Sequence, residues 1–155
     1  MIIIGIISVI DELDFERIKN HELIVRATDA ITQIYAEVPV LIKVTDINDC
    51  YPILFQKYFN ISLFENQPIG TPILTVNATD CDSTANSELS YEIEHSHTSS
   101  FFYIDEYNGS LILKSHLDYE EYTSHYLIVN VKDHGTPSLN SKVNIFINGR
   151  FQFHT

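Results

Sequence analysis

The stretch Asp46–Pro52, which reads DINDCYP, organises this chain of 155 residues. Its side chains at positions 46, 48 and 49 are acidic or amide, and alternating apolar segments lie on both sides of it. Pro52 has no backbone N–H to donate and favours an extended residue before it, so the stretch joins strands of separate modules and is not a hairpin turn. Closely spaced carboxylate and amide oxygens are the ligands that Ca2+ prefers. The stretch therefore predicts a calcium-dependent junction between two modules.

The composition indicates a folded, strand-rich and acidic chain. Hydrophobic residues make up 45% of it, which is enough for a packed core. Tyrosine and phenylalanine number nine each, and β-branched residues are frequent, which favours strands. The net charge of -12 argues against nucleic acid as a partner, because phosphate binding needs a cationic face. At this length we expect one complete domain and part of a second.

Three tripeptides fit the acceptor pattern for N-glycosylation and favour a secreted context: Asn60-Ile61-Ser62, Asn77-Ala78-Thr79 and Asn108-Gly109-Ser110. The apolar start, Met1–Ile10, lacks a basic segment and is too short to span a bilayer, so we expect a strand there and not a signal peptide. No other segment of the sequence could span a membrane. The anchor of a membrane-bound native protein is therefore expected outside this sequence.

The chain repeats itself with a shift of 104 positions. Leu13–Glu16 then matches Leu117–Glu120, and Leu23–Val25 matches Leu127–Val129. Single identities occur at Gly5 and Gly109, His21 and His125, and Asp29 and Asp133. Modules of about one hundred residues are predicted from this spacing. We place the back half of one module and its linker at residues 1–49, a nearly complete module at 50–148, and an irregular tail at 149–155.

The fold class is predicted to be all-β, with a seven-stranded Greek-key β-sandwich after a partial module, because short strands alternate with turn signals. In the second module we expect strands at Phe59–Phe64, Ile73–Thr79, Leu89–Ile93, Phe102–Ile104, Ser110–Lys114, His125–Lys132 and Val143–Ile147. The first module supplies three: Ile3–Ile10, His21–Thr28 and Val38–Thr45. Asn108-Gly109 predicts a two-residue hairpin turn.

Acidic residues gather in short groups at the predicted strand ends. Asp80 and Asp82 alternate, so both carboxylates lie on one side of an extended segment. This segment begins like an EF-hand loop, but Ala85 and Tyr91 stand where that loop needs glycine and glutamate. His95 and His97 are interpreted as part of an exposed polar turn, since zinc needs a third and usually a fourth ligand.

These motifs resemble those of the cadherin ectodomain repeat over about residues 3–148. Asp46–Asp49 with Pro52 and Phe55 resembles the linker motif between repeats. The remaining motifs resemble the opening Glu motif, the Asp-x-Asp motif, the two Asp-x-Glu motifs and the late Asp-x-Gly-x-Pro stretch: Phe64-Glu65-Asn66, Ala78–Asp82, Leu13–Glu16, Leu117–Glu120 and Val131–Pro137. The order and spacing of several motifs make this resemblance specific.

The resemblance implies three Ca2+ ions that stiffen the junction. It assigns as ligands Asp14 and Glu16 of the upper repeat, Asp46, Ile47, Asn48, Asp49 and Cys50 of the linker, and Asp80, Asp82, Asn86 and Asp133 of the lower repeat, with carbonyls at 47, 50 and 86. The opening Glu of the upper repeat would lie before Met1, so we expect the two ions nearest that repeat to be weakly held and the third, near Asp133, to be best formed. It also implies that Glu65, Asp118 and Glu120 are half of the next site.

Cys50 and Cys81 both flank this third site. Extracellular proteins commonly form disulfides, but side chains in these motifs alternate and could point apart. The sequence therefore leaves open whether the two thiols are bonded.

The resemblance implies a non-enzymatic, calcium-dependent cell–cell adhesion module that stands outside the cell at the plasma membrane. Its implied partners are other cadherin ectodomains, homophilic or heterophilic, and it meets a membrane only through parts of a longer protein. The alternative is an extracellular β-sandwich that binds ligands or has a structural role without calcium. A metal-dependent hydrolase is disfavoured, because saturated carboxylate cages leave no coordination position for substrate water.

Overall fold

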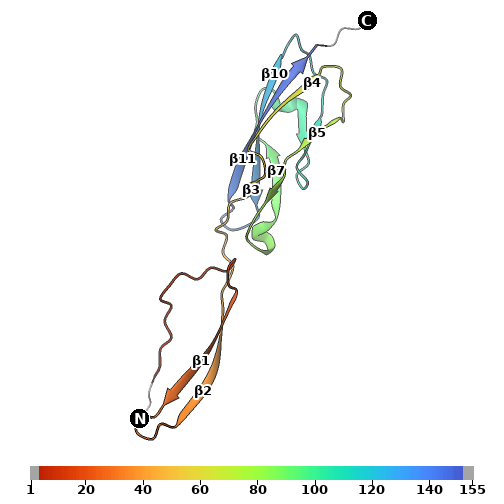
Figure 1. Cartoon of the computed structure of the whole chain (residues 1–155). Coiled ribbons are helices and arrows are strands. Elements are labelled where there is room, and N and C mark those ends of the chain that lie inside the picture. The colour runs from red at the N-terminus through yellow and green to blue at the C-terminus, as the bar shows by residue number, and fades with distance from the viewer. Residues whose placement is uncertain (1–3, 152–155) are drawn as a thin grey trace. The chain divides into compact units, whose positions relative to one another are not determined.

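A computed structural model describes residues 4–151 of the chain. The chain forms two compact units, Met1–Ile47 and Asn48–Thr155 (Figure 1). Each unit is built of strands and turns, and the helical segments among the described residues are two short 3-10 turns, η1 (Thr84–Ser87) and η2 (Ser99–Phe101). The predicted all-β class is confirmed.

The first unit contains one antiparallel pair of strands. Strand β1 (Asn20–Thr28) pairs with β2 (Tyr35–Lys43) along its whole length. The turn between them is held by Asp29, whose carboxylate accepts hydrogen bonds from the N–H groups of Ile31 and Thr32 at 2.8 Å. These bonds to the charged form lower the pKa of Asp29, with the backbone bond from Thr32 as the largest cause.

The predicted strand at Ile3–Ile10 is wrong for the described residues 4–10, which form no strand, and Ile3 lies outside the described residues. A strand is stable when a neighbour pairs with its backbone, and the sheet of this unit contains β1 and β2 within the described residues. Apolar residues alone therefore did not make this segment a strand. Many apolar side chains of the unit are exposed, among them Ile24 at 71% and Val38 at 59%.

The second unit is a sandwich of antiparallel sheets with one parallel edge strand. Its strands are β3 (Ile53–Leu54), β4 (Tyr58–Phe64), β5 (Pro72–Thr75), β6 (Ala78–Thr79), β7 (Leu89–Ile93), β8 (Phe102–Ile104), β9 (Ser110–Leu113), β10 (Ser124–Asp133) and β11 (Asn140–Arg150). A four-stranded sheet has the order β4-β11-β10-β7, and a three-stranded sheet has the order β5-β9-β8. The short strands β3 and β6 pair with each other.

The core lies between these sheets and follows the alternation of the sequence. Leu127, Val129 and Val131 of β10 are fully buried, as are Leu111 and Leu113 of β9. Burying a Val, Leu or Ile side chain stabilises a fold by about 1.5–3 kcal/mol relative to leaving it exposed. The core therefore fixes the register of β10, and with it the position of Asp133 at the end of that strand.

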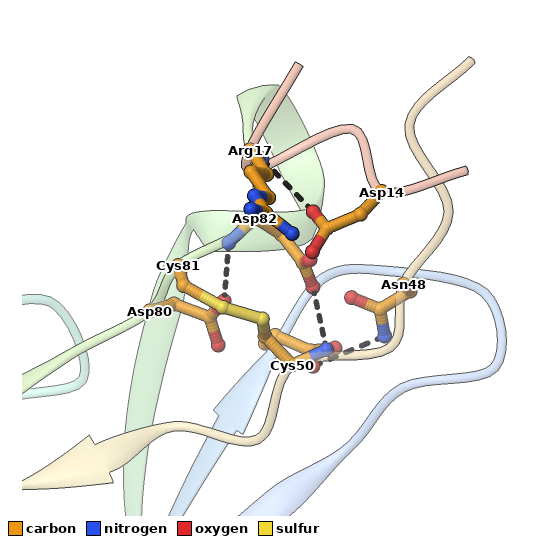
Figure 2. The surroundings of a disulfide bond; sticks show 8 residues. Asp14, Arg17, Asn48, Cys50, Asp80, Cys81 and Asp82 are labelled. Atoms are coloured by element: carbon orange, nitrogen blue, oxygen red, sulfur yellow. Dashed lines mark hydrogen bonds between the residues drawn. A yellow bond between two sulfur atoms is a disulfide. The ribbon is translucent and has the colours of Figure 1, made fainter. Parts of the chain in front are cut away.

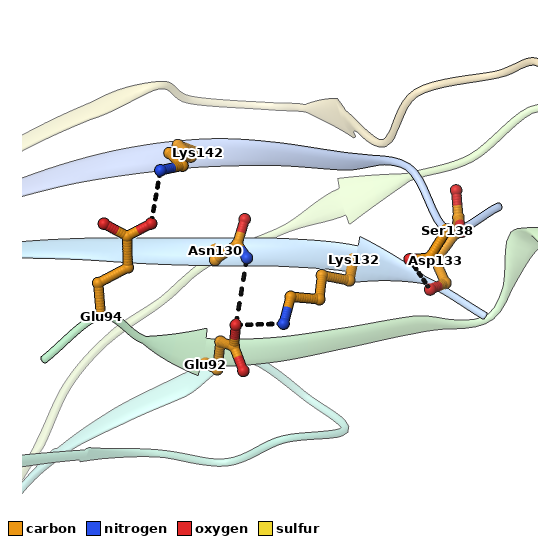
Figure 3. Close-up of polar contacts among 7 residues, drawn as sticks. All are labelled: Glu92, Glu94, Asn130, Lys132, Asp133, Ser138 and Lys142. Atoms are coloured by element: carbon orange, nitrogen blue, oxygen red, sulfur yellow. Dashed lines mark hydrogen bonds and ion pairs between the residues drawn. The ribbon is translucent and has the colours of Figure 1, made fainter. Parts of the chain in front are cut away.

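Polar side chains on the outer face of the four-stranded sheet pair between β7, β10 and β11 (Figure 3). Lys132 pairs with Glu92, and the amide of Asn130 donates to the same carboxylate at 3.2 Å. Lys142 pairs with Glu94 at 2.6 Å. The side chains of both ion pairs are about half exposed to solvent. Exposed ion pairs of this kind contribute little to the free energy of unfolding.

The structure assigns nine strands to the second unit in place of seven, for two reasons. The predicted strand Ile73–Thr79 is divided, because the chain leaves β9 after Thr75 and pairs with β3 from Ala78 onward. The two-residue strand β3 had no signal in the sequence. The predicted irregular tail at 149–155 is wrong at its start, because β11 continues to Arg150. Residues 152–155 of that tail lie outside the described residues.

The predicted two-residue hairpin turn at Asn108-Gly109 is wrong in length. Strands β8 and β9 do form a hairpin, but the loop runs from Asp105 to Gly109, where the carboxylate of Asp105 accepts the N–H groups of Tyr107 and Asn108. Gly109 has φ +67°, and a Cβ there would overlap the carbonyl oxygen of Val76. This position therefore requires glycine for two independent reasons.

Candidate metal centre

Three segments of the second unit meet where its chain begins. Residues 48–52 lead into β3, residues 80–82 follow β6, and Asp133 ends β10. The entering segment is fixed by Pro52, which is buried and whose carbonyl accepts a hydrogen bond from the Ser141 hydroxyl at 2.7 Å. Figure 2 shows Asn48 of the first segment near Asp80 and Asp82 of the second, and a hydrogen bond joins Asn48 to Asp133 of the third.

Asp133 is 2% exposed and is held by the turn that follows β10. Its carboxylate accepts the N–H of Gly135 at 3.0 Å and the N–H of Leu139 at 3.0 and 3.1 Å. The hydroxyl of Ser138 closes the same turn by donating to the Asp133 carbonyl at 2.8 Å (Figure 3). These hydrogen bonds satisfy acceptor sites of the buried carboxylate and fix its position at the end of β10.

Asn48 links the entering segment to this turn. Its Nδ2 donates to Oδ2 of Asp133 at 3.1 Å and to the carbonyl oxygen of Pro137 at 2.6 Å. A Cβ on Gly135 would overlap the Asn48 carboxamide, so the close approach of the two segments depends on glycine at that position. Since Nδ2 is used in both bonds, Oδ1 is the atom of this side chain that is left to bind something else.

Asp80 and Asp82 form the second half of the arrangement. Oδ1 of Asp80 accepts the N–H of Asp82 at 3.0 Å, and Oδ2 of Asp82 accepts the N–H of Cys50 at 3.2 Å. Asp82 is 7% exposed, so two of the three carboxylates at this end are buried. The segment bends after β6, and these bonds connect residues 80–82 to the entering chain at Cys50.

A disulfide joins Cys50 to Cys81, with 5.9 Å between their Cα atoms (Figure 2). This resolves the alternative that the sequence left open. Ligand atoms of both cysteines, Asp80 and Asp82 lie within 4.8 Å of one another. Sulfur atoms in a disulfide carry no thiolate charge, so the ligands in this group are the carboxylates and the disulfide holds their two segments together.

The donor set fits a hard cation. Oδ2 of Asp80 and Oδ1 of Asn48 are buried oxygens without a hydrogen-bond partner, which leaves each with unused lone pairs. None of the ion pairs found among residues 4–151 involves Asp80 or Asp133. Carboxylates gathered in one place repel one another unless a cation joins them, and oxygen-only ligands select Ca2+ over the softer metals.

The other predicted ligands divide between the two units. Asp14, Glu16, Asp46 and Ile47 belong to the first unit, where the carboxylate of Asp14 accepts the N–H of Arg17 at 2.9 Å. Asp49 lies in the second unit and is exposed. Asn86 lies in η1, four residues after Asp82 in the loop that the disulfide anchors.

At the opposite end of the second unit the structure brings Glu65 to the turn that contains Asp118 and Glu120. Oε2 of Glu65 accepts the N–H of Tyr119 at 3.4 Å. Oδ1 of Asp118 accepts the N–H groups of Glu120 and Glu121 at 2.9 and 3.2 Å. These carboxylates come from two distant segments, at a place separate from Asp133, and their role in a further calcium site stays a prediction.

Sequence reasoning missed several groups that support the site. These groups lie in the turn after β10. They are the N–H of Leu139, which bonds Asp133, the carbonyl of Pro137, which bonds Asn48, and Gly135, whose missing side chain leaves room for Asn48. Backbone groups leave no side-chain signature, and the signal that was available was the spacing of Asp133, Gly135 and Pro137. That spacing marked the turn but not its contact with Asn48, which lies far away in the sequence.

Comparisons with known proteins agree with this fold. The family model described as "Cadherin domain" matches residues 59–148. The chain is 49% identical over 146 residues to the Fat-like cadherin-related tumor suppressor homolog of Drosophila melanogaster and 41% identical over 141 residues to human protocadherin Fat 1. These matches cover 92% and 90% of the chain but 3% of each relative.

Solved structures give the same result. Mouse cadherin-23 EC22-24 matches with a TM-score of 0.84 and 29% identity, over 90% of this chain and 45% of that one. The extracellular cadherin domains 1-4 of protocadherin gamma B7 match with a TM-score of 0.81 and 28% identity, over 90% of this chain and 34% of that one. The fold is therefore the one shared by the repeat modules of these cadherin structures.

The chain belongs to the cadherin domain family, and its relatives include Fat-like and protocadherin repeats. Cadherin domains are adhesion modules and not enzymes. The predicted resemblance to cadherin repeats and the predicted non-enzymatic character are therefore confirmed. Among the described residues, no helix has the length and apolar character needed to cross a membrane.

Proposed function

We propose that this chain is a calcium-binding piece of a Fat-like or protocadherin-like ectodomain, in which Ca2+ stiffens the junction between successive repeats. The observation that carries the proposal is two buried oxygens without a partner, Oδ1 of Asn48 and Oδ2 of Asp80. The Asn48 side chain also bonds the buried carboxylate of Asp133. Leaving such atoms buried without a partner costs free energy, and a cation would recover it.

Asn48, Asp80, Asp82 and Asp133 would hold the best-formed ion, together with the carbonyls of Cys50 and Asn86. When bound, Ca2+ supplies positive charge that cancels the repulsion among these carboxylates. The ligands come from the entering chain, the loop after β6 and the end of β10, so binding would fix the entering chain against the sandwich. Asp14, Glu16, Asp46, Ile47 and Asp49 would serve the two weaker ions of the junction.

In the whole protein we propose that the module acts in cell–cell adhesion outside the cell, at the plasma membrane, with other cadherin ectodomains as partners. Homophilic pairing is the form of adhesion that we favour. The chain spans 3% of the length of the Drosophila melanogaster and human Fat relatives, so adhesion by the whole protein is part of this proposal. The related solved chain of protocadherin gamma B7 consists of extracellular cadherin domains, which supports this location.

Limited proteolysis tests the proposed stiffening. In millimolar Ca2+ we expect the bonds of residues 46–52 to resist cleavage, and in chelator we expect them to be cut. Asp80→Asn should abolish the difference, because it removes a charge from the ion while keeping the Oδ1 that accepts the Asp82 N–H. Equal cleavage of the unmodified chain in both conditions would count against the proposal.

A second candidate is the calcium-independent extracellular sandwich. The disulfide between Cys50 and Cys81 favours it, because this bond ties the entering chain to the loop after β6 without any ion. Under this alternative, the stability of the chain would depend on the disulfide and would be the same in Ca2+ and in chelator.

A further inference from the structure

Strand β4 carries an N-glycosylation sequon in an unusual setting. The sequon is Asn60-Ile61-Ser62, and β4 is the outer strand of the four-stranded sheet. Phe59, Ile61 and Leu63 turn inward and pack against the core, so Asn60 and Ser62 lie on the outer face, where both are exposed. An acceptor asparagine must be reachable at the surface, and this one is.

Three aromatic residues share the outer face of the sheet with Asn60. Tyr58 lies two residues earlier on the same side of the strand and is 54% exposed. Phe146 of β11 is the register partner of Asn60, and Tyr126 of β10 is in turn the register partner of Phe146. The hydroxyl of Tyr126 is fixed by a 2.6 Å hydrogen bond to Oδ1 of Asn144. These rings form an aromatic shelf, here Tyr58, Tyr126 and Phe146, with Asn60 at its edge.

The hydrogen bond of Asn60 leaves its reactive atom available. Nδ2 of Asn148 donates to Oδ1 of Asn60 at 2.9 Å. N-glycosylation takes place at Nδ2, so the attachment of a sugar keeps this bond and fixes the orientation of the amide. The other two sequons lack this setting: the residue two places before Asn77 is Thr75, and the residue two places before Asn108 is Glu106.

We propose that Asn60 is N-glycosylated and that the first N-acetylglucosamine packs on the aromatic shelf. In the transfer, Nδ2 of Asn60 forms a bond to the anomeric carbon of an oligosaccharide carried on a polyprenyl diphosphate. The bond from that carbon to the diphosphate oxygen breaks, the diphosphate leaves with the electron pair, and the amide nitrogen loses a proton. The C–H face of the sugar then gains dispersion contacts with exposed rings that otherwise face water.

Such a glycan would also protect the edge of the sheet. An outer strand with exposed aromatic residues can pair with strands of other chains, and bulky or charged groups on the edge prevent this. On β4, Tyr58 and Phe64 are 54% and 40% exposed, and Asn60 lies between them. The inference needs the extracellular location of the module but not its calcium, so its failure would leave the proposed calcium function untouched.

The test is to secrete the whole chain from animal cells behind a cleavable leader and to map its glycopeptides by mass spectrometry. The same chain from the bacterial periplasm provides the unglycosylated reference. We expect a glycan on Asn60 and a Tm about 4 °C above the reference, as expected for a small gain in a domain of this size. Ser62→Ala should remove both effects while leaving the Tm of the bacterial chain unchanged, because Ser62 is exposed.

Tyr58→Thr separates packing from attachment. With Tyr58→Thr the glycan should still be attached, but the Tm difference between secreted and bacterial chains should disappear. Thr79→Ala and Ser110→Ala are matched controls that delete the other two sequons and should leave this difference in place. An unmodified Asn60 in the secreted chain would overturn the proposal, as would a Tm difference that Tyr58→Thr leaves intact.

Discussion

Nδ2 of Asn48 donates a hydrogen bond to Oδ2 of Asp133 at 3.1 Å, although the two residues are 85 positions apart in the chain. This bond connects the segment through which the chain enters the second unit with the end of the core strand β10. Because the core fixes β10, Asp133 is a rigid reference point to which the entering segment is tied. The calcium proposal depends on this connection, and so do the first two predictions.

Asp133→Asn should destabilise the chain even without calcium. The carboxylate accepts hydrogen bonds from Asn48, Gly135 and Leu139, and an amide has one acceptor oxygen in place of two. Leaving a buried donor unsatisfied costs about 1–3 kcal/mol, so the free energy of unfolding in chelator should fall by that amount. Denaturant unfolding measures it. The matched control is Asp118→Asn, an exposed carboxylate in a similar turn, for which a loss of equal size would contradict the argument.

Gly135→Ala should displace Asn48. The new methyl group would overlap the Asn48 carboxamide, and relieving such an overlap costs about 1–3 kcal/mol. We expect a lower free energy of unfolding and weaker calcium binding, measured by denaturant unfolding and calorimetry. Gly5→Ala is the control, because a Cβ there meets no atom within 4 Å. Unchanged calcium affinity in Gly135→Ala would show that Asn48 is not a ligand.

Reduction of the disulfide should make the chain more dependent on calcium. Cys50 and Cys81 are separated by 31 positions, and closing a loop of this size stabilises a fold by about 2–4 kcal/mol. Without the bond, an ion would be the remaining link between the entering segment and the loop after β6. The Tm gain from Ca2+ should therefore be larger with reductant than without it. A chain that gains nothing from Ca2+ in either state would support the calcium-independent alternative.

Acid should destabilise the second unit through His125. This residue is 1% exposed, both of its ring nitrogens lack hydrogen-bond partners, and the rings of Phe101, Phe102 and Tyr122 surround it. Burial lowers the pKa of His125 below its ordinary value of 6.5. Below pH 6.5 the imidazole of His125 therefore binds a proton in the unfolded chain but stays neutral in the folded chain until the pH falls to its lowered pKa. The free energy of unfolding therefore falls as the pH decreases from 6.5.

The expected slope from one such group is at most about 1.4 kcal/mol per pH unit. Denaturant unfolding at several pH values between neutral and about pH 5, in chelator, should show this slope reduced in His125→Phe, which keeps an aromatic ring but cannot bind a proton. Parallel pH profiles of the two chains would show that other groups cause the acid sensitivity.

Much of the fold followed from local patterns in the sequence. Leu127, Val129 and Val131 alternate with polar residues, and all three are fully buried on one side of β10. The predicted bounds of β7 and β8 are confirmed, since turn residues enclose both. Alternation predicts a strand well where a neighbour pairs with it, and it failed at residues 4–10, where the described sheet offers no such neighbour.

The residues of the candidate site were named from the resemblance to cadherin repeats, but their connections could not be predicted. The structure places Asn48, Asp80, Asp82 and Asp133 at one end of the second unit, and their role as ligands stays a prediction. Whether Cys50 and Cys81 are bonded depends on Cα separation and side-chain direction, which the sequence does not contain. The contact of Gly135 with Asn48 likewise requires the three-dimensional path of the turn after β10.

Calorimetric titration of the whole chain with Ca2+ tests the central claim most directly. We predict saturable binding by the chain and its loss or severe weakening in Asp80→Asn, whose Oδ2 is a buried oxygen without a partner in the unmodified chain. Asp105→Asn, which changes a carboxylate in the β8–β9 turn, should bind like the unmodified chain. Absence of calcium binding at millimolar concentration, or equal binding by Asp80→Asn, would contradict the account.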